Sequence, residues 1–118
     1  MPYIKEENRT NLDRCIDDMI ICLKTNIQND NEKNPDSNPK NRGLSNQELL
    51  EICGDINYTF SRILGGTMGE ISYPKIAIIT GVLENIKQEF YRRAAAPYEN
   101  LKINQNGDIK EYKTLKVK

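Results

Sequence analysis

The chain has 118 residues, which suits a single domain large enough for a modest core. Its 17 basic and 17 acidic residues cancel, and a formal charge of zero argues against a dedicated duplex-DNA-binding protein, which needs a net basic face. Histidine is absent, so a catalytic triad with a histidine base and a metal site with histidine ligands are both excluded. A net charge of zero also offers little repulsion between copies and permits an oligomer.

Three cysteines, Cys15, Cys22 and Cys53, occur without any CxxC spacing. Each falls on an apolar helical stripe, so we expect buried free thiols rather than a zinc or redox site. Free thiols favour a reducing, cytoplasmic setting. The charged start of the chain argues against a signal peptide, and no apolar run approaches the roughly 20 residues that span a bilayer. We therefore expect a soluble cytoplasmic protein.

The first helical pattern begins at about Thr10, a plausible N-cap, with a short helical turn before it at residues 6–8. Spacings of three and four place seven apolar side chains on one face. They are Leu12, Cys15, Ile16, Met19, Ile20, Leu23 and Ile27. Residues 28–43 follow, and Asn, Asp, Pro and Lys dominate there, so we predict a long mobile polar loop.

The second and third helices have clear starts. Ser45 and Glu48 fit a capping box, and Gly65-Gly66 are expected to end the second helix. Ser72 is the expected cap of the third helix, with Pro74 in its first turn. Pro97 is expected to end that helix.

The last segment, residues 99–112, contains Asn106-Gly107 between alternating residues, which is a strong β-hairpin signal. Residues 113–118 are expected to fray. The predicted fold is mainly α: one helical domain over residues 1–118, built as a three-helix bundle with a short C-terminal β-hairpin and a long polar loop after the first helix.

Polar residues beside the apolar stripes give one candidate binding site. Arginine forks would hold phosphate or carboxylate, tyrosine rings would frame the ligand, and an asparagine would hydrogen-bond it. The predicted residues are Asn57, Tyr58, Arg62, Tyr91, Arg92, Arg93 and Tyr98. Because one small protomer has little room for an enclosed pocket, we expect this site to form between subunits of a homo-oligomer.

Two other interpretations use the same residues. Glu89 lies three and four positions before Arg92 and Arg93, so the cluster could be only an ion-paired surface. Tyrosine and arginine are also the anchors enriched in protein interfaces, which indicates a structural or assembly module that binds another protein. A nucleic-acid partner is disfavoured by the charge balance.

An enzyme is disfavoured. Carboxylates such as Asp55 and Glu84 have no defined spacing across two helices, and carboxylate metal sites in bundles normally add a histidine. Gly65-Gly66 and the residues after them lack the GxxxxGK[ST] phosphate loop. We predict no catalytic residue, no metal site and no cofactor.

Several stretches together, MPYIKEENR, NRGLSNQ, GDINYTFSRIL and GVLENIKQEFYRRAAAPYENLKINQNGD, resemble a family of small uncharacterised proteins of tailed phages, prophages and bacteria. The family carries only a domain-of-unknown-function label. The resemblance implies a phage-type accessory protein in the host cytoplasm. By analogy with such proteins, it would bind a host or phage protein, or sequester a host nucleotide signal as an anti-defence function.

Overall fold

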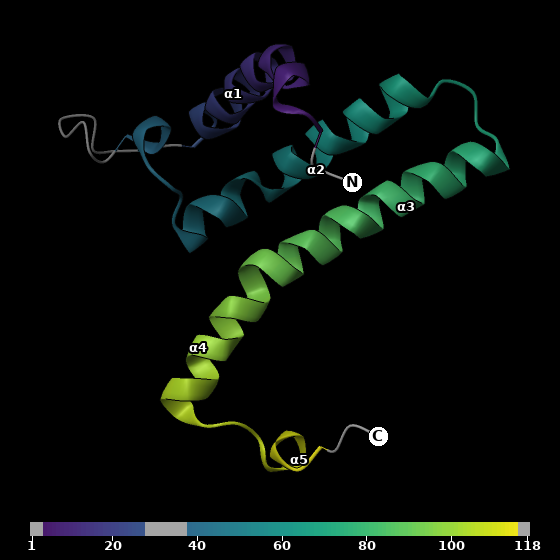
Figure 1. The fold of residues 1–118 in the computed structure, drawn as a ribbon. Helices are drawn as coiled ribbons and strands as arrows, with labels where there is room; N and C mark the ends of the chain where they lie inside the picture. Colours follow the sequence, from purple (N-terminus) through teal and green to yellow (C-terminus); the bar gives the residue numbers. More distant parts are fainter. Residues whose placement is uncertain (1–3, 28–37, 116–118) are drawn as a thin grey trace. The chain divides into compact units, whose positions relative to one another are not determined.

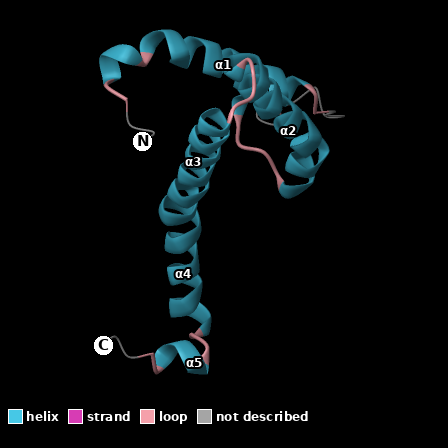
Figure 2. Cartoon of the chain, turned by 90° about the vertical axis from the view of Figure 1, so that its right-hand side faces the viewer, coloured by secondary structure: helices cyan, strands magenta, loops and turns pink. Residues whose placement is uncertain are grey.

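A computed structural model describes residues 4–27 and 38–115. The α-helices in these residues are α1 (Thr10–Thr25), α2 (Asn46–Met68), α3 (Tyr73–Phe90), α4 (Ala96–Asn106) and α5 (Lys110–Lys113), as Figure 1 shows. Shorter helical segments are η1 (Glu6–Asn8), η3 (Pro39–Asn41) and the π-helical η4 (Tyr91–Ala95). No β-strand occurs in the described part of the chain (Figure 2). The chain divides into two compact units, one within Tyr3–Ser72 and the other within Tyr73–Lys118.

The first unit joins α1 to the start of α2. The helix α1 begins at Thr10, as its sequence predicts, and η1 precedes it. The expected N-cap at Thr10 is wrong, since the N-cap is Arg9 and no side chain caps the helix. Lys24 Nζ donates a 2.8 Å hydrogen bond to the carbonyl of Arg42, and Asn26 Nδ2 donates one of 3.2 Å to Asp55 Oδ2. These two bonds fix the C-terminal end of α1 against η3 and α2.

The predicted loop over residues 28–43 lies partly outside the described residues, which resume at Asn38. From there the chain forms η3, in which Pro39 is buried. The Asn38 side chain accepts a 3.0 Å hydrogen bond from the backbone N–H of Lys40. This end of the segment therefore carries a capped turn that lies against α1.

The helix α2 begins with the predicted capping box. Ser45 Oγ accepts from the Glu48 N–H at 3.2 Å, and Glu48 Oε1 accepts from the Ser45 N–H at 3.0 Å. The predicted stop at Gly65-Gly66 is wrong, since α2 continues to Met68. Its C-cap is Gly69, whose φ of 72° is open to glycine at little steric cost.

In the second unit, the expected end of the third helix at Pro97 is wrong. The chain passes from α3 through η4 into α4 without leaving a helical conformation, and Pro97 lies in the first turn of α4 (Figure 1). The Ala96 N–H bonds to the carbonyl of Tyr91, five residues back, which marks a π turn. Because proline lacks an N–H and crowds the carbonyl four residues before it, an interruption in the α pattern at this place accommodates Pro97.

The predicted β-hairpin over residues 99–112 is also wrong. Residues up to Asn106 belong to α4, and the Gly107 N–H bonds to the carbonyl of Ile103 at 2.8 Å. Gly107 has a φ of 87°, so the Asn-Gly signal ends a helix instead of turning two strands. The predicted frayed tail includes Lys113, which is in α5, and residues 116–118, which lie outside the described residues.

The chain is mainly helical, as predicted, but it is not the single three-helix bundle with a hairpin that the stripes suggested. Among the described large apolar side chains only Ile27 and Ile52 are buried, with 6% and 2% exposure. The prediction of buried thiols is wrong as well, since all three cysteines are exposed. The physical reason is that a periodic stripe shows which face a helix can bury and does not show what covers it.

Candidate binding residues on two helical units

Three of the predicted site residues lie within two turns of α2. Arg62 Nη1 donates a 3.3 Å hydrogen bond to Tyr58 Oη, and its guanidinium lies 6.0 Å from the centre of the Tyr58 ring. This places the pair at the outer limit of a cation–π contact. Asn57 Oδ1 accepts a 3.4 Å hydrogen bond from Ser61 Oγ, one turn further along. The spacing of four residues puts each partner on the same side of the helix.

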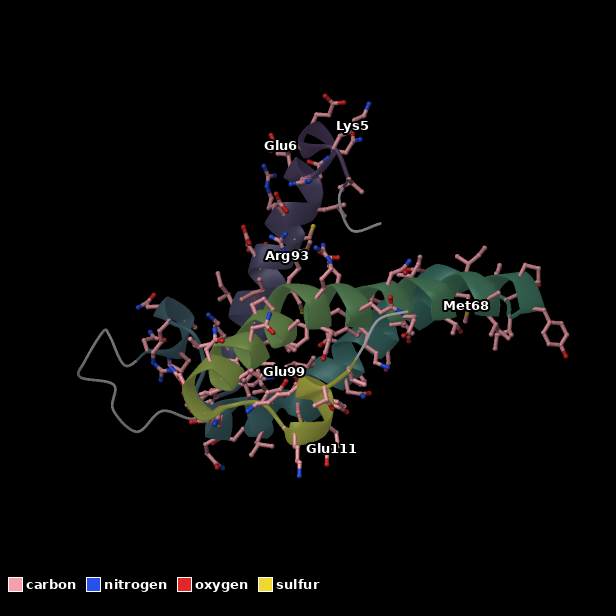
Figure 3. All side chains as sticks on the ribbon, turned by 60° about the horizontal axis from the view of Figure 1, so that its bottom comes forward. Lys5, Glu6, Met68, Arg93, Glu99 and Glu111 are labelled. Atoms are coloured by element: carbon pink, nitrogen blue, oxygen red, sulfur yellow. The ribbon has the colours of Figure 1, made fainter. Side chains whose placement is uncertain are left out.

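Three more predicted residues, Tyr91, Arg92 and Arg93, are consecutive in the π turn. Arg92 Nη2 lies 2.8 Å and 3.0 Å from the two carboxylate oxygens of Glu89. The predicted ion pair of Glu89 with one of the two arginines is therefore present, and it is made by Arg92. Arg93, labelled in Figure 3, is exposed, and its side chain makes no hydrogen bond or ion pair with the residues that the structure describes.

Tyr91 and Tyr98 are held by contacts along the same segment. The Tyr91 hydroxyl donates a 3.1 Å hydrogen bond to Glu99 Oε2, and this bond raises the pKa of the Tyr91 phenol. Lys102 Nζ lies 5.5 Å from the centre of the Tyr98 ring, within cation–π range. Both rings remain more than half exposed.

The seven predicted residues therefore form two groups, each within its own unit. Asn57, Tyr58 and Arg62 belong to the first unit, and the four others belong to the second. Sequence reasoning missed Glu99 and Lys102 as their neighbours. In a regular α-helix, residues eight positions apart such as Tyr91 and Glu99 do not lie on the same face. The π turn adds one residue and brings the two side chains together.

Two surface depressions accompany the second group. One of about 700 Å³ runs beside residues 84–95 and is lined in part by Tyr91 and Arg92. The other, of about 380 Å³, lies between the end of α4 and α5 and is lined in part by Tyr98, Lys102 and Tyr112. Sequence reasoning did not identify Tyr112, because it placed this residue in a hairpin strand.

These two groups present guanidinium and ammonium charges, phenol rings and hydroxyl donors. No set of three or more His, Cys, Asp or Glu side chains in the described residues is arranged to hold a metal ion. No helix in the described part of the chain combines the length and apolar content needed to cross a membrane.

One comparison with known proteins identifies a relationship. The sequence profile of a family described as "Domain of unknown function (DUF6899)" matches residues 1–109. No curated protein and no solved structure matches the chain significantly.

Proposed function

The chain belongs to the DUF6899 family, a domain of unknown function, and from that premise we propose that it is a protein-interaction module without catalytic activity. The observation that carries this proposal is the exposure of its aromatic side chains. Tyr58, Phe90 and Tyr98 are 64%, 69% and 61% exposed. Aromatic residues together with arginine are the side chains that contribute most to protein interfaces.

The arginines of the two groups support a protein partner over a strongly anionic one. Arg62 is held against Tyr58 and Arg92 is neutralised by Glu89, so both are already oriented by neighbouring side chains. Such ordering reduces the entropy that binding must overcome. These two groups present little unpaired positive charge and a large aromatic area. A protein surface with carboxylates and apolar side chains is complementary to both features.

Affinity purification from the cells that encode the chain tests this function. The tagged chain is expected to retain one protein at fixed stoichiometry, and Tyr58→Ser and Tyr98→Ser are each expected to reduce the retained amount about tenfold or more. Tyr73→Ser is the matched control, because Tyr73 is 89% exposed and lies outside both groups. Equal retention by all three variants would contradict the proposal.

A second candidate, binding of an anionic small ligand between subunits, is favoured by one observation. Arg93 is exposed beside Tyr91 and Arg92 with no carboxylate bound to it among the described residues. The Arg93 guanidinium could bind a nucleotide phosphate there. In this candidate function the chain is a phage accessory protein that sequesters a host nucleotide signal and so has an anti-defence function. The resemblance to phage and prophage proteins and the free thiols support a phage origin and a cytoplasmic location.

Thermal-shift measurements with cyclic and linear nucleotides test the ligand candidate. A nucleotide at 100 times its dissociation constant would stabilise the chain by about 2.7 kcal/mol. Arg93→Ala is expected to abolish the shift, and Arg14→Ala, an exposed arginine on α1, is expected to preserve it. If no nucleotide raises the melting temperature, the ligand candidate is rejected and the protein-interaction module remains.

A further inference from the structure

The segment from α3 to α4 carries one apolar row whose spacing is the same when it is read from either end. Its members, which we call the row, are Leu83, Ile86, Phe90, Ala94, Tyr98 and Leu101. Successive members are three, four, four, four and three positions apart. Spacings of three and four are those of a helix that packs lengthwise against another helix.

The π turn keeps this row on one face. Phe90 and Tyr98 are eight positions apart, one more than a heptad, and in an uninterrupted α-helix the extra residue would turn Tyr98 away by about a quarter turn. The π turn Tyr91–Ala95 lies between them and takes up one additional residue. Tyr98 and Leu101 therefore continue the line of Leu83 and Phe90.

The row has no cover within its own unit. Leu83, Phe90 and Tyr98 are 44%, 69% and 61% exposed. In the described part of this unit, α3 and α4 meet end to end through the π turn, and α5 has only four residues. An exposed apolar row of this length is typical of an interaction surface.

We propose that the row is covered by the row of a second copy of this chain, packed antiparallel to it. This inference rests on the proposed function and names one partner of the module. The symmetric spacing supports it, because reversing the row about Arg92 places Phe90 opposite Ala94, with Ile86 opposite Tyr98 and Leu83 opposite Leu101. A large ring then meets a small methyl group at the centre, which is the complementarity that close packing requires.

The charges beside the row favour the antiparallel direction. Glu89 and Arg93 are one turn apart on the same flank of the row. In an antiparallel pair, Glu89 of each copy comes within one turn of Arg93 of the other. In a parallel pair, this flank would face the opposite flank of the other copy, so Glu89 and Arg93 of the two copies would not meet. A two-fold pair of this kind is the commonest form of homo-oligomer.

The area is sufficient for a stable pair. About half of each large side chain in the row is exposed, and Ile76 and Val82 beside it are each 45% exposed. Together these side chains offer on the order of 700 Å² per copy. A standard interface takes about 800 Å² from each partner.

Sedimentation of the full chain over a range of concentrations tests the proposal. The chain is expected to form a dimer, and Phe90→Glu is expected to weaken it at least a hundredfold because it buries two carboxylates near the axis. Ile78→Glu is the matched control, since Ile78 is 64% exposed on α3 but lies off the row, and its dimer is expected to persist. Circular dichroism of both variants confirms that helix content is retained.

Disulfide cross-linking tests the direction, in a background in which the three native cysteines are replaced by serine. A mixture of Leu83→Cys and Leu101→Cys chains is expected to cross-link to each other upon oxidation, and neither is expected to cross-link to itself. Self-cross-linking of each variant would indicate a parallel pair and overturn the proposal. A monomer at every concentration would also overturn it, because the row would then be covered within one chain or left in water.

These results can be separated from the test of function. If the chain is a monomer but Tyr58→Ser retains less partner protein than the unchanged chain in the affinity purification, the interaction module stands and self-pairing is rejected. If the chain is an antiparallel dimer and no partner is lost in any tyrosine variant, self-pairing stands and binding of a different protein is rejected.

Discussion

Tyr91 and Glu99 are joined by a 3.1 Å hydrogen bond between side chains eight positions apart. The bond crosses the π turn and Pro97, so it connects the first residue of that turn to the first turn of α4. Such π turns occur frequently at functional places in helices. The bond is therefore a direct report on whether this interruption exists in solution.

Glu99→Gln tests it through the pKa of Tyr91. The hydrogen bond to Glu99, and then the negative charge of that carboxylate, raise the pKa of the phenol above 10.0. Because the folded state holds this proton more tightly, the stabilisation is fully present below pH 10 and is lost as the pH rises through the raised value. Glu99→Gln is expected to lower the pKa of Tyr91, as measured by NMR titration. Glu111→Gln, on α5, is the control and is expected to leave the pKa of Tyr91 unchanged.

How far the sequence predicts this chain depends on whether a signal is local. The start of α1 at Thr10 and the capping box of Ser45 and Glu48 are confirmed, because each depends on a few neighbouring residues. The predicted helix end at Pro97 and the predicted hairpin at Gly107 are wrong, because proline is also accommodated in the first turn of a helix and glycine also ends one. At Pro97 the outcome depends on the π turn, which has no sequence signature of its own.

The candidate site shows the same limit. The pairs of Tyr58 with Arg62 and of Glu89 with Arg92 follow from helical spacing, and both are present. Which helices face one another depends on long-range packing, which periodicity does not specify. Periodicity therefore predicted one site from seven residues, although three of them belong to the first unit and four to the second.

The capping box is expected to contribute measurably to the stability of the first unit. Ser45→Ala removes the acceptor for the Glu48 N–H and is expected to lower the free energy of unfolding by about 1 kcal/mol. Ser61→Ala, in the interior of α2, is the control and is expected to be neutral or slightly stabilising, because alanine is the better helix former. Urea unfolding followed by circular dichroism compares the two, and equal losses would show that the cap is not formed.

The pair of Arg42 and Glu48 predicts a response to acid. The bidentate hydrogen bonds from Arg42, at 2.7 Å and 3.0 Å, are the main cause that lowers the pKa of Glu48 from 4.5 to about 2. A lowered pKa means that the stabilisation is present above pH 4.5 and is lost as the pH falls towards 2. NMR of the Ser45 amide is expected to report loss of the cap across this range. In Glu48→Gln the transition is expected to be absent.

The exposure of the cysteines predicts that Cys53 is replaceable. Cys53→Ser is expected to change the free energy of unfolding by less than about 0.5 kcal/mol, as surface substitutions do. Ile52→Ala is the matched control. Ile52 is next to Cys53 in the sequence and its side chain is 2% exposed, so its truncation is expected to cost about 2–5 kcal/mol. A large loss in Cys53→Ser would indicate that this face of α2 is covered in solution.

Two glycines provide a comparison of backbone strain with helix propensity. Gly107 has a φ of 87°, and although nothing lies within 4 Å of the position of an added Cβ, alanine is strained there. Gly107→Ala is expected to destabilise the end of α4 by about 1 kcal/mol or more. Gly66 lies within α2, has the same open space around it and has no positive φ.

Gly66→Ala is therefore expected to stabilise the chain by about 0.4–1 kcal/mol, since it restricts the unfolded state without straining the folded one. Urea unfolding of both variants, with circular dichroism for helix content, measures the difference in sign. Opposite signs support a helix that ends at Gly107. If Gly107→Ala stabilised the chain as Gly66→Ala does, residue 107 would have an ordinary helical φ, and α4 would continue through it into α5.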